Sequence, residues 1–353
     1  MSTQAMTSID VARRAGVSQS AVSLVFSGKA NGRVSRRTEG AIWKAARDLG
    51  YRPNSAAQAL RLGHAKRLVL AVPDIDNPYF AGTLKGAERE ARRHGYSAAL
   101  AQVREPEDWQ NVILDALASG SVDGFALFAL RPPTLRTMQA LRGKAILVDA
   151  SSRGFACIRL DIEGGVGAAV SHLLELGHKR IGHLAANIEV ETFALRKKAY
   201  LSTMQNAGLA CRAEWQTEAP FDVIGASIAA TQILTGRRAP SAIVCDSDVL
   251  AAGVYKAAKA VRLRIPEDLS IVGIDDSLIA RVLDPPLTTV AVPAIQVGGQ
   301  GVRLLVNLLE GGEPSQPCPI PLNLVVREST APLTQNHPLR PKAKEQSHGS
   351  SSS

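Results

Sequence analysis

The chain has few cysteines, few aromatic residues and no long apolar run. Its four cysteines form no CxxC pair, so the sequence predicts neither a zinc site nor a disulfide framework. Aromatic residues make up only 4% against 45% hydrophobic residues overall, which favours helices and parallel strands over an aromatic-rich β architecture. No run of about 18 apolar residues and no basic-plus-apolar leader pattern occurs. We therefore expect a cytoplasmic protein with no membrane segment.

Complete catalytic motifs are also missing. The stretch "GGVGAA" (164–169) only partly imitates a dinucleotide loop, and His172, His178 and His183 do not share one helix face. Asp275 and Asp276 are paired carboxylates that could serve acid–base chemistry, but no nucleophile with a base partner is recognisable. They equally suit hydrogen bonds to a sugar hydroxyl or a purine. We therefore expect binding rather than catalysis, with no cofactor and no metal.

The net charge of +9 is concentrated in the first fifth of the chain. Residues 1–67 hold twelve Lys and Arg side chains against three Asp and Glu, which accounts for the whole excess. The remaining residues are neutral overall. This segregation is typical of a small polyanion-binding module on a neutral body, although a solvated basic face would also produce it.

The first 52 residues read as three short helices. Thr7 can cap the first helix with Asp10 completing a capping box, and Ser18 can cap the second. A third helix is predicted from Ser35 to Leu49. Ile9, Ala12 and Ala15 recur on one face of the first helix, and Val22, Val25 and Phe26 on one face of the second. The spacing of the first two helices indicates a helix-turn-helix headpiece.

The second helix has a mixed outer face. If its apolar residues point inward, Ser20 and Leu24 lie opposite them, with Gln19 and Ser23 at the edge. Gln suits a bidentate contact with adenine, and Leu suits a thymine methyl group. The alternatives are an ordinary helical hairpin and, for Leu24, packing against a neighbouring loop.

Beyond the headpiece, residues 53–66 predict a hinge helix or linker too short to be stable alone. From Arg67 short apolar runs alternate with amphipathic stretches, the pattern of an α/β body with parallel sheets. Its length indicates two lobes, with a ligand bound between them at the carboxyl ends of strands. We expect the polar tail, residues 331–353, to be disordered.

Specific motifs resemble one known family. "TSIDVARRAGVSQSAVSLVFSGK" and "VSRRTEGAIWKAARDLGYRPNSAAQALR" are similar to the DNA-binding headpiece of lactose and galactose repressors. The body resembles the same family through "DIDNPYFAGTLKGAEREARRHGY", "HLLELGHKRIGHLAA" and "CDSDVLAAGVYKAAKAVRLRIPEDLSIVGIDDS". The resemblance covers residues 7 to about 328.

The resemblance implies a periplasmic-binding-protein-like body over residues 67–330. The N-lobe would comprise residues 67–161 and 292–322, and the C-lobe residues 162–291 and 323–330. It further implies a transcriptional regulator, a repressor of carbohydrate-related genes, that binds double-stranded operator DNA of near-palindromic sequence as a homodimer. A small-molecule effector, a sugar or sugar derivative, would control this binding. The alternative is a solute-binding receptor of the same architecture without a DNA role.

The resemblance also assigns site residues. Base reading falls to Gln19, Ser20, Ser23 and Leu24; phosphate or backbone contacts to Thr7, Ser18, Arg33, Ser35, Tyr51 and Asn54; minor-groove insertion to Ala57 and Leu60. The effector site would comprise Tyr79, Phe80, Asp149, Thr192, Arg196, Phe221, Asp248 and Asp275.

Two features depart from the family pattern. Leu24 stands where arginine is common, and the loop "GKANGRV" is about two residues longer than usual, which shifts Lys29 and Arg33.

Overall fold

The computed structural model describes residues 6–28, 30–51, 64–103, 106–129 and 138–333. The chain divides into two compact units, with a boundary between Lys66 and Arg67. We call the first the headpiece and the second the body, and describe each by itself. Residues 334–353 of the predicted tail and most of the predicted hinge, including Asn54, Ala57 and Leu60, lie outside the described residues. The expected disorder is wrong for residues 331–333, because the N–H groups of Ala331 and Leu333 donate to Ser270 Oγ at 3.2 Å and to the Leu176 carbonyl oxygen at 2.8 Å.

The described part of the headpiece contains three helices, α1 (Ser8–Ala15), α2 (Gln19–Phe26) and α3 (Arg36–Asp48). Gly16, with φ +66°, ends α1 in the left-handed conformation that glycine adopts without steric cost. Fully buried Val11, Val22 and Ile42, one from each helix, form the centre of a small core. The helical headpiece and the α/β body confirm the predicted fold class.

One detail of the headpiece pattern is wrong. Ile9 was expected to share an apolar face of α1 with Ala12 and Ala15, but it is 51% exposed, whereas Val11 and Ala12 are buried. The apolar spacing allowed either face, and packing against α2 and α3 selects the face with Val11. Phe26 instead packs edge-on against Trp43 and Tyr51, with ring centroids 4.8 and 5.5 Å apart.

The body begins with a five-stranded parallel sheet of order β2-β1-β3-β4-β5. Its strands are β1 (Arg67–Val72), β2 (Ser97–Gln102), β3 (Gly124–Phe128), β4 (Ala145–Val148) and β5 (Ala156–Ile158). The connecting helices are α5 (Pro78–Arg93), α6 (Pro106–Ala118) and the short η1 (Met138–Leu141). Residues of β3 and β4 are buried throughout, as expected for strands covered on both faces.

A six-stranded sheet of order β11-β10-β9-β8-β6-β7 follows. Its strands are β6 (Ile181–Ala186), β7 (Gln216–Ala219), β8 (Ala242–Cys245), β9 (Ser270–Asp275), β10 (Thr288–Ala291) and β11 (Asn323–Val325). Its helices are α8 (Ile162–Glu175), α9 (Glu191–Asn206), η2 (Ala213–Trp215), α10 (Val223–Leu234), α11 (Asp248–Ala260) and α12 (Leu278–Val282). Only β11 runs antiparallel to its neighbour.

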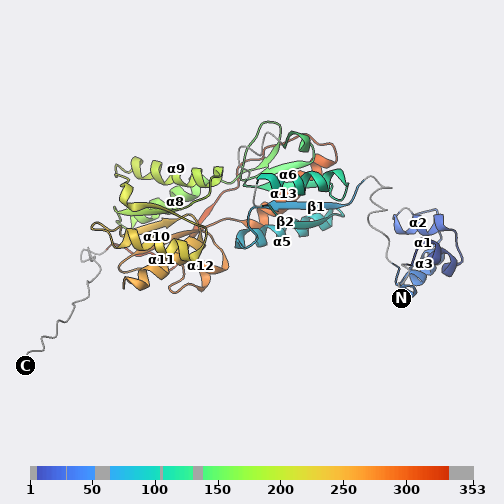
Figure 1. The fold of residues 1–353 in the computed structure, drawn as a ribbon, viewed down its shortest axis with the longest axis horizontal. Helices are drawn as coiled ribbons and strands as arrows, with labels where there is room; N and C mark the ends of the chain where they lie inside the picture. The colour runs from blue at the N-terminus through green and yellow to red at the C-terminus, as the bar shows by residue number, and fades with distance from the viewer. Residues whose placement is uncertain (1–5, 29, 52–63, 104–105, 130–137, 334–353) are drawn as a thin grey trace, which may run out of the picture. The chain divides into compact units, whose positions relative to one another are not determined.

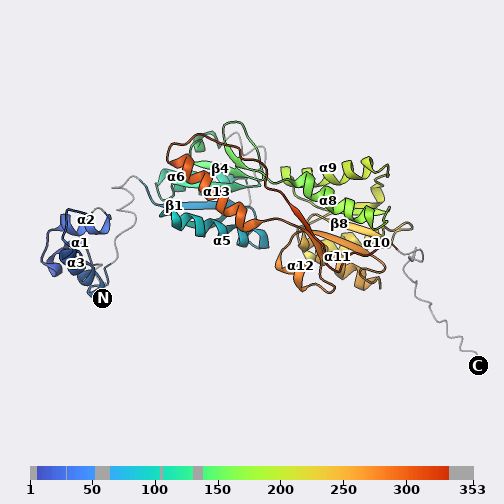
Figure 2. The same ribbon diagram turned by 180° about the vertical axis from the view of Figure 1, so that it is seen from behind.

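The chain then returns to the first sheet. Helix α13 (Ala294–Leu309) follows β10 but packs against α5 and against strands β3, β4 and β5 of the first sheet (Figures 1 and 2). Helices α5 and α13 cross very closely: a Cβ atom on Gly298 would lie 1.9 Å from the carbonyl oxygen of Thr83. The chain passes back to the second sheet for β11. Each lobe is thus built from separate stretches of sequence.

The short apolar runs that predict strands after Arg67 correspond to seven strands of the structure, β1, β2, β3, β4, β6, β8 and β9. The four other described strands were not predicted: β5 and β11 have only three residues each, and β7 (QTEA) and β10 (TTVA) lack the continuous apolar run of the equally short β4 and β8. The stretch 164–169 lies inside α8, so its glycines form helix rather than a phosphate-binding turn. No helix in the described part of the chain is long and apolar enough to cross a membrane.

Candidate functional site

Three of the predicted phosphate-contacting residues are helix caps. The Oγ atoms of Ser18 and Ser35 accept the backbone N–H groups of Ala21 at 3.2 Å and Thr38 at 3.1 Å. Thr7 forms the predicted capping box of α1, in which its own N–H donates to Asp10 at 2.9 Å. These three caps are exposed. Helix N-termini attract anions through their free N–H groups and the helix dipole, so this geometry suits phosphate binding.

The four predicted base-reading residues lie along α2. Gln19 and Ser20 are exposed in its first turn, and the Gln19 side chain donates to Ser8 Oγ at 3.1 Å. Ser23 and Leu24 are half-buried. Leu24 therefore keeps part of its apolar surface open, as a contact to a thymine methyl group requires.

The other two predicted backbone contacts differ from each other. Arg33 is exposed in the loop before α3, where its long cationic side chain can reach phosphate. Tyr51 is half-buried, and its ring packs against Phe26.

A cavity of about 110 Å³ lies within the body. Seven of the eight predicted effector residues line it: Tyr79, Phe80, Asp149, Thr192, Arg196, Phe221 and Asp275. They come from both lobes and lie at or just after the carboxyl ends of strands, where ligands bind in open α/β folds. We call this space the aromatic cavity.

Aromatic rings provide much of its wall. The ring of Phe80 lies 5.2 Å from that of Tyr79 and 5.6 Å from that of Phe128, in both cases edge-on. From the other lobe, Phe193 and Phe221 lie with their centroids 6.1 Å apart. Rings from two sides can hold a ring-shaped ligand by its faces.

Arg196 supplies the only guanidinium group among the described residues that line the aromatic cavity. It is 6% exposed, one of its terminal nitrogens donates to the carbonyl oxygen of Asp246, and its charge lies over the Phe193 ring at 4.8 Å. Its Nε atom has no hydrogen-bond partner among the described residues. A buried donor without a partner is costly, so it suits a polar group of a ligand.

Two carboxylates face Arg196 in the cavity wall. Burial raises the pKa of Asp149 to about 6, and the charge of Arg196 opposes this rise. The Tyr79 hydroxyl donates to Asp149 Oδ2 at 3.3 Å. Burial also raises the pKa of Asp275. Both residues have positive φ, +56° at Asp149 and +126° at Asp275, and such strain in non-glycine residues gathers at functional sites.

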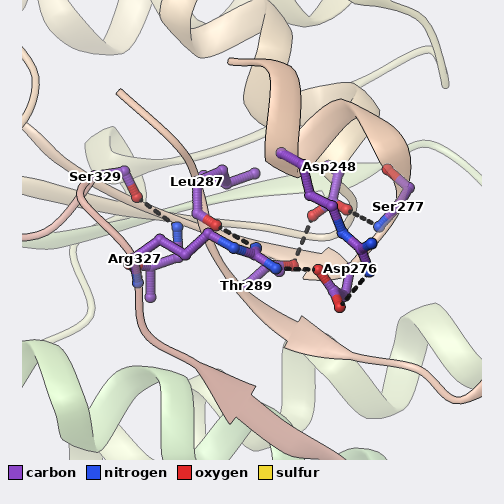
Figure 3. Close-up of polar contacts among 9 residues, drawn as sticks. Asp248, Asp276, Ser277, Leu287, Thr289, Arg327 and Ser329 are labelled. Atoms are coloured by element: carbon purple, nitrogen blue, oxygen red, sulfur yellow. Dashed lines mark hydrogen bonds and ion pairs between the residues drawn. The ribbon is translucent and has the colours of Figure 1, made fainter. Parts of the chain in front are cut away.

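Asp248 does not belong to the described lining of this cavity. Its carboxylate is fully buried, and it accepts hydrogen bonds from Thr289 Oγ1 at 2.6 Å and from the Ser277 N–H at 2.7 Å (Figure 3). Direct contact of Asp248 with an effector therefore stays a prediction, and in this structure its carboxylate makes internal hydrogen bonds. Asp248 fixes the turn that follows Asp275.

Arg327 fixes the same turn from the other side. Its guanidinium donates to Asp276 and to the Leu287 carbonyl oxygen, the latter at 2.8 Å (Figure 3). Asp276 also pairs with exposed Arg281 at 3.2 Å. These bonds compensate for the positive φ of Asp275 and Asp276 and hold the Asp275 carboxylate at the cavity.

Several residues that line the aromatic cavity were not predicted from the sequence, among them Asp74, Asn77, Phe128 and Phe193. An Asn directly before Pro78 is a sequence signal for a helix N-cap, and Asn77 does cap α5 by accepting the Tyr79 N–H at 3.0 Å. Phe128 ends a strand, and Phe193 adjoins Thr192. Nothing in their immediate sequence separates either residue from ordinary core positions.

The three histidines have structural partners. His172 bonds Thr330, His178 bonds Ser241, and His183 bonds Asp246 at 2.8 Å. Across the described ranges, no group of three or more His, Cys, Asp or Glu side chains could hold a metal ion.

The fold and the two candidate sites define a class of protein. A helix-turn-helix headpiece on a two-lobed ligand-binding body is the architecture of a ligand-responsive DNA-binding regulator. Comparison with known proteins agrees with this class. Residues 8–54 match the family described as bacterial regulatory proteins, lacI family, and residues 170–330 match the periplasmic binding protein-like domain.

Full-length relatives show the family. The HTH-type transcriptional repressor CytR of Escherichia coli (strain K12) is 30% identical, and the match covers 93% of this chain and 97% of that protein. The HTH-type transcriptional repressor PurR of Proteus mirabilis (strain HI4320) is 32% identical, with 91% and 96% covered. The chain belongs to the lacI family of bacterial regulatory proteins. It is a DNA-binding transcriptional regulator and not an enzyme.

A solved structure extends the likeness to three dimensions. The lac repressor dimer bound to operator and the anti-inducer ONPF is 25% identical, with a TM-score of 0.83 over 93% of this chain and 100% of that one. The headpiece match argues against the alternative of a solute-binding receptor without a DNA role.

Proposed function

We propose that the protein is a repressor that binds a near-palindromic operator as a homodimer in the cytoplasm, and that a small molecule in the aromatic cavity changes its affinity for that operator. The observation that carries this proposal is the convergence of aromatic rings, Arg196 and two buried carboxylates in one cavity of a protein with a DNA-binding headpiece. An effector that favours one arrangement of the lobes shifts the population of operator-competent dimers.

Exposed apolar side chains support the homodimer. On α12, Leu278 and Val282 are 72% and 68% exposed and lie one turn apart. On α10, Ile224 and Ile228 are 55% and 61% exposed with the same spacing. Both helices pack on α11. Apolar side chains exposed in this way favour association with a second copy, and a two-fold dimer would place two headpieces on two half-sites.

The polar edge and the aromatic faces of the cavity support a ring-shaped effector with hydroxyl groups, a sugar or sugar derivative. The carboxylates accept hydroxyl donors and Arg196 donates to oxygen, while the rings contact the less polar faces. The transcriptional regulator CelR, solved as a cellobiose complex, has a related fold, at 27% identity and a TM-score of 0.69 over 92% of this chain and 99% of that one.

Footprinting on the DNA that flanks the protein's own gene tests this function. We expect a protected site with dyad symmetry, whose affinity falls as salt concentration rises because phosphate contacts release counterions. Protection without a preferred site, or no protection at any salt concentration, would contradict the proposal.

A further inference from the structure

A second, larger cavity adjoins the aromatic cavity. It has a volume of about 290 Å³ and shares Asp149, Leu160 and Thr192 with the first. Its other walls come from the segment after β4, from residues 159–161 between β5 and α8, from the first two residues of α8, and from α9 and Pro319. We call it the polar cavity, because its described lining contains no aromatic ring and is rich in charged side chains.

The shared wall carries buried polar atoms that no described residue satisfies. Thr192 is 8% exposed, and its Oγ1 atom has no hydrogen-bond partner among the described residues. The Oδ1 atom of Asp149 is also buried without a partner there. A buried polar group without a partner is costly, so a ligand group that pairs with it is favoured. Because both residues line both cavities, one ligand that spans the boundary would satisfy both atoms.

The charge of the lining restricts the ligand's chemistry. The described carboxyl groups around the two cavities are those of Asp74, Asp149, Asp161, Glu163, Glu191 and Asp275, against two guanidinium groups, Arg159 and Arg196. Of these carboxylates, Glu163 pairs with the cation Lys198 at 2.7 Å, whereas Glu191 accepts from the uncharged Ser151 N–H at 3.1 Å. The negative charge of the lining is therefore only partly neutralised. A phosphate or carboxylate on the ligand would face like charges.

We propose that the effector is an unphosphorylated molecule of two parts: a ring held in the aromatic cavity, and a neutral or cationic arm bearing hydroxyl or amino groups that enters the polar cavity and contacts Thr192 and Asp149. This inference rests on the proposed function and narrows its effector class. Glycosides and nucleosides satisfy it, whereas sugar phosphates and nucleotides do not.

The charge requirement is tested on the full-length protein bound to the operator found by footprinting. A filtered small-molecule extract of cells is split by anion exchange into a flow-through of neutral and cationic compounds and a retained anionic fraction. We expect the flow-through alone to change operator affinity. A response confined to the retained fraction overturns the inference, and a response to neither fraction overturns the proposed effector control itself.

The requirement for an arm is tested with two variants that fill the polar cavity from opposite walls, Ser151→Trp and Pro319→Trp. Both positions are exposed, so the added ring need not disturb the core. We expect each to require about tenfold more flow-through for the same response, with operator affinity in the absence of extract unchanged. Arg153→Trp, at an exposed position outside both described linings, is the matched control. Equal responses from the control and both filled variants overturn the inference.

Discussion

Arg327 donates a hydrogen bond to Asp276 although the two residues are 51 positions apart in the sequence, and both side chains are only 18% exposed. The pair connects the segment after β11 to the turn that presents Asp275. This turn also rests on buried Asp248, so its shape depends on contacts from three separate parts of the chain.

Replacing Arg327 with Met should therefore destabilise the body and loosen the turn. We expect the free energy of unfolding in urea to fall by about 1–3 kcal/mol, because Asp276 loses a largely buried partner. Arg281→Met removes a partner that is 62% exposed and should cost less than about 1 kcal/mol. Equal losses for the two variants would contradict the role of Arg327.

The pKa of Asp149 predicts a pH-dependent contribution to stability. Burial raises this pKa to about 6 in the folded protein, whereas an unfolded chain titrates near about 3.9. Between these values only the folded state keeps the proton, so the stabilising contribution is complete below the unfolded pKa and is lost as the pH rises through about 6.

Asp149→Asn removes this contribution. Relative to the wild type and without effector, the free energy of unfolding of the variant should rise by about 2–3 kcal/mol between pH 4 and pH 7. Urea unfolding of both proteins across this range measures the difference. A difference that does not vary with pH would show that Asp149 titrates normally.

The close crossing of α5 and α13 predicts opposite effects at adjacent glycines. Gly298→Ala would place a Cβ atom 1.9 Å from the Thr83 carbonyl oxygen, so the helices must separate, at a cost of at least about 2 kcal/mol. At Gly299 the nearest atom is 3.8 Å away, and Ala there should be neutral or stabilising by up to about 1 kcal/mol. Thermal unfolding compares the two, and equal midpoints would refute the tight crossing.

Leu24 predicts a difference in operator sequence from relatives that have arginine at this position. Leu24→Arg should shift one operator position toward G·C, because arginine pairs with guanine where leucine contacts a thymine methyl group. Since Leu24 is half-buried and lies outside the fully buried core, the fold should persist. Selection of binding sites from random DNA measures the preference, and an unchanged site profile would exclude base reading by this residue.

Local sequence was sufficient for the features that depend on local chemistry. The caps at Thr7, Ser18 and Ser35 follow from a hydroxyl before an apolar-periodic stretch, and seven of the described strands follow from short apolar runs. The effector residues required the family resemblance, because they lie far apart in sequence and meet only when two lobes fold.

The errors have physical causes. The sequence also could not show that the carboxylate of Asp248, which follows a buried strand as cavity residues do, turns toward Thr289 and Ser277, because only the packing of β10 and α12 decides that direction. Ile9 fits the helical apolar period with Ala12, yet Ile9 is 51% exposed, because Val11 and Ala12 are the residues of α1 that pack into the headpiece core. The polar cavity had no sequence signal, because its carboxylates also look like ordinary surface residues.

Control of the headpiece by the cavity in the body is tested by operator affinity, measured with and without the flow-through fraction, in the wild type and in Arg196→Met. Arg196 lies in the cavity wall and belongs to the body, so its loss should remove the response and leave operator binding without extract unchanged. We expect the fraction to change the affinity of the wild type by about 5–150-fold and that of the variant not at all. The same change in both proteins would contradict it.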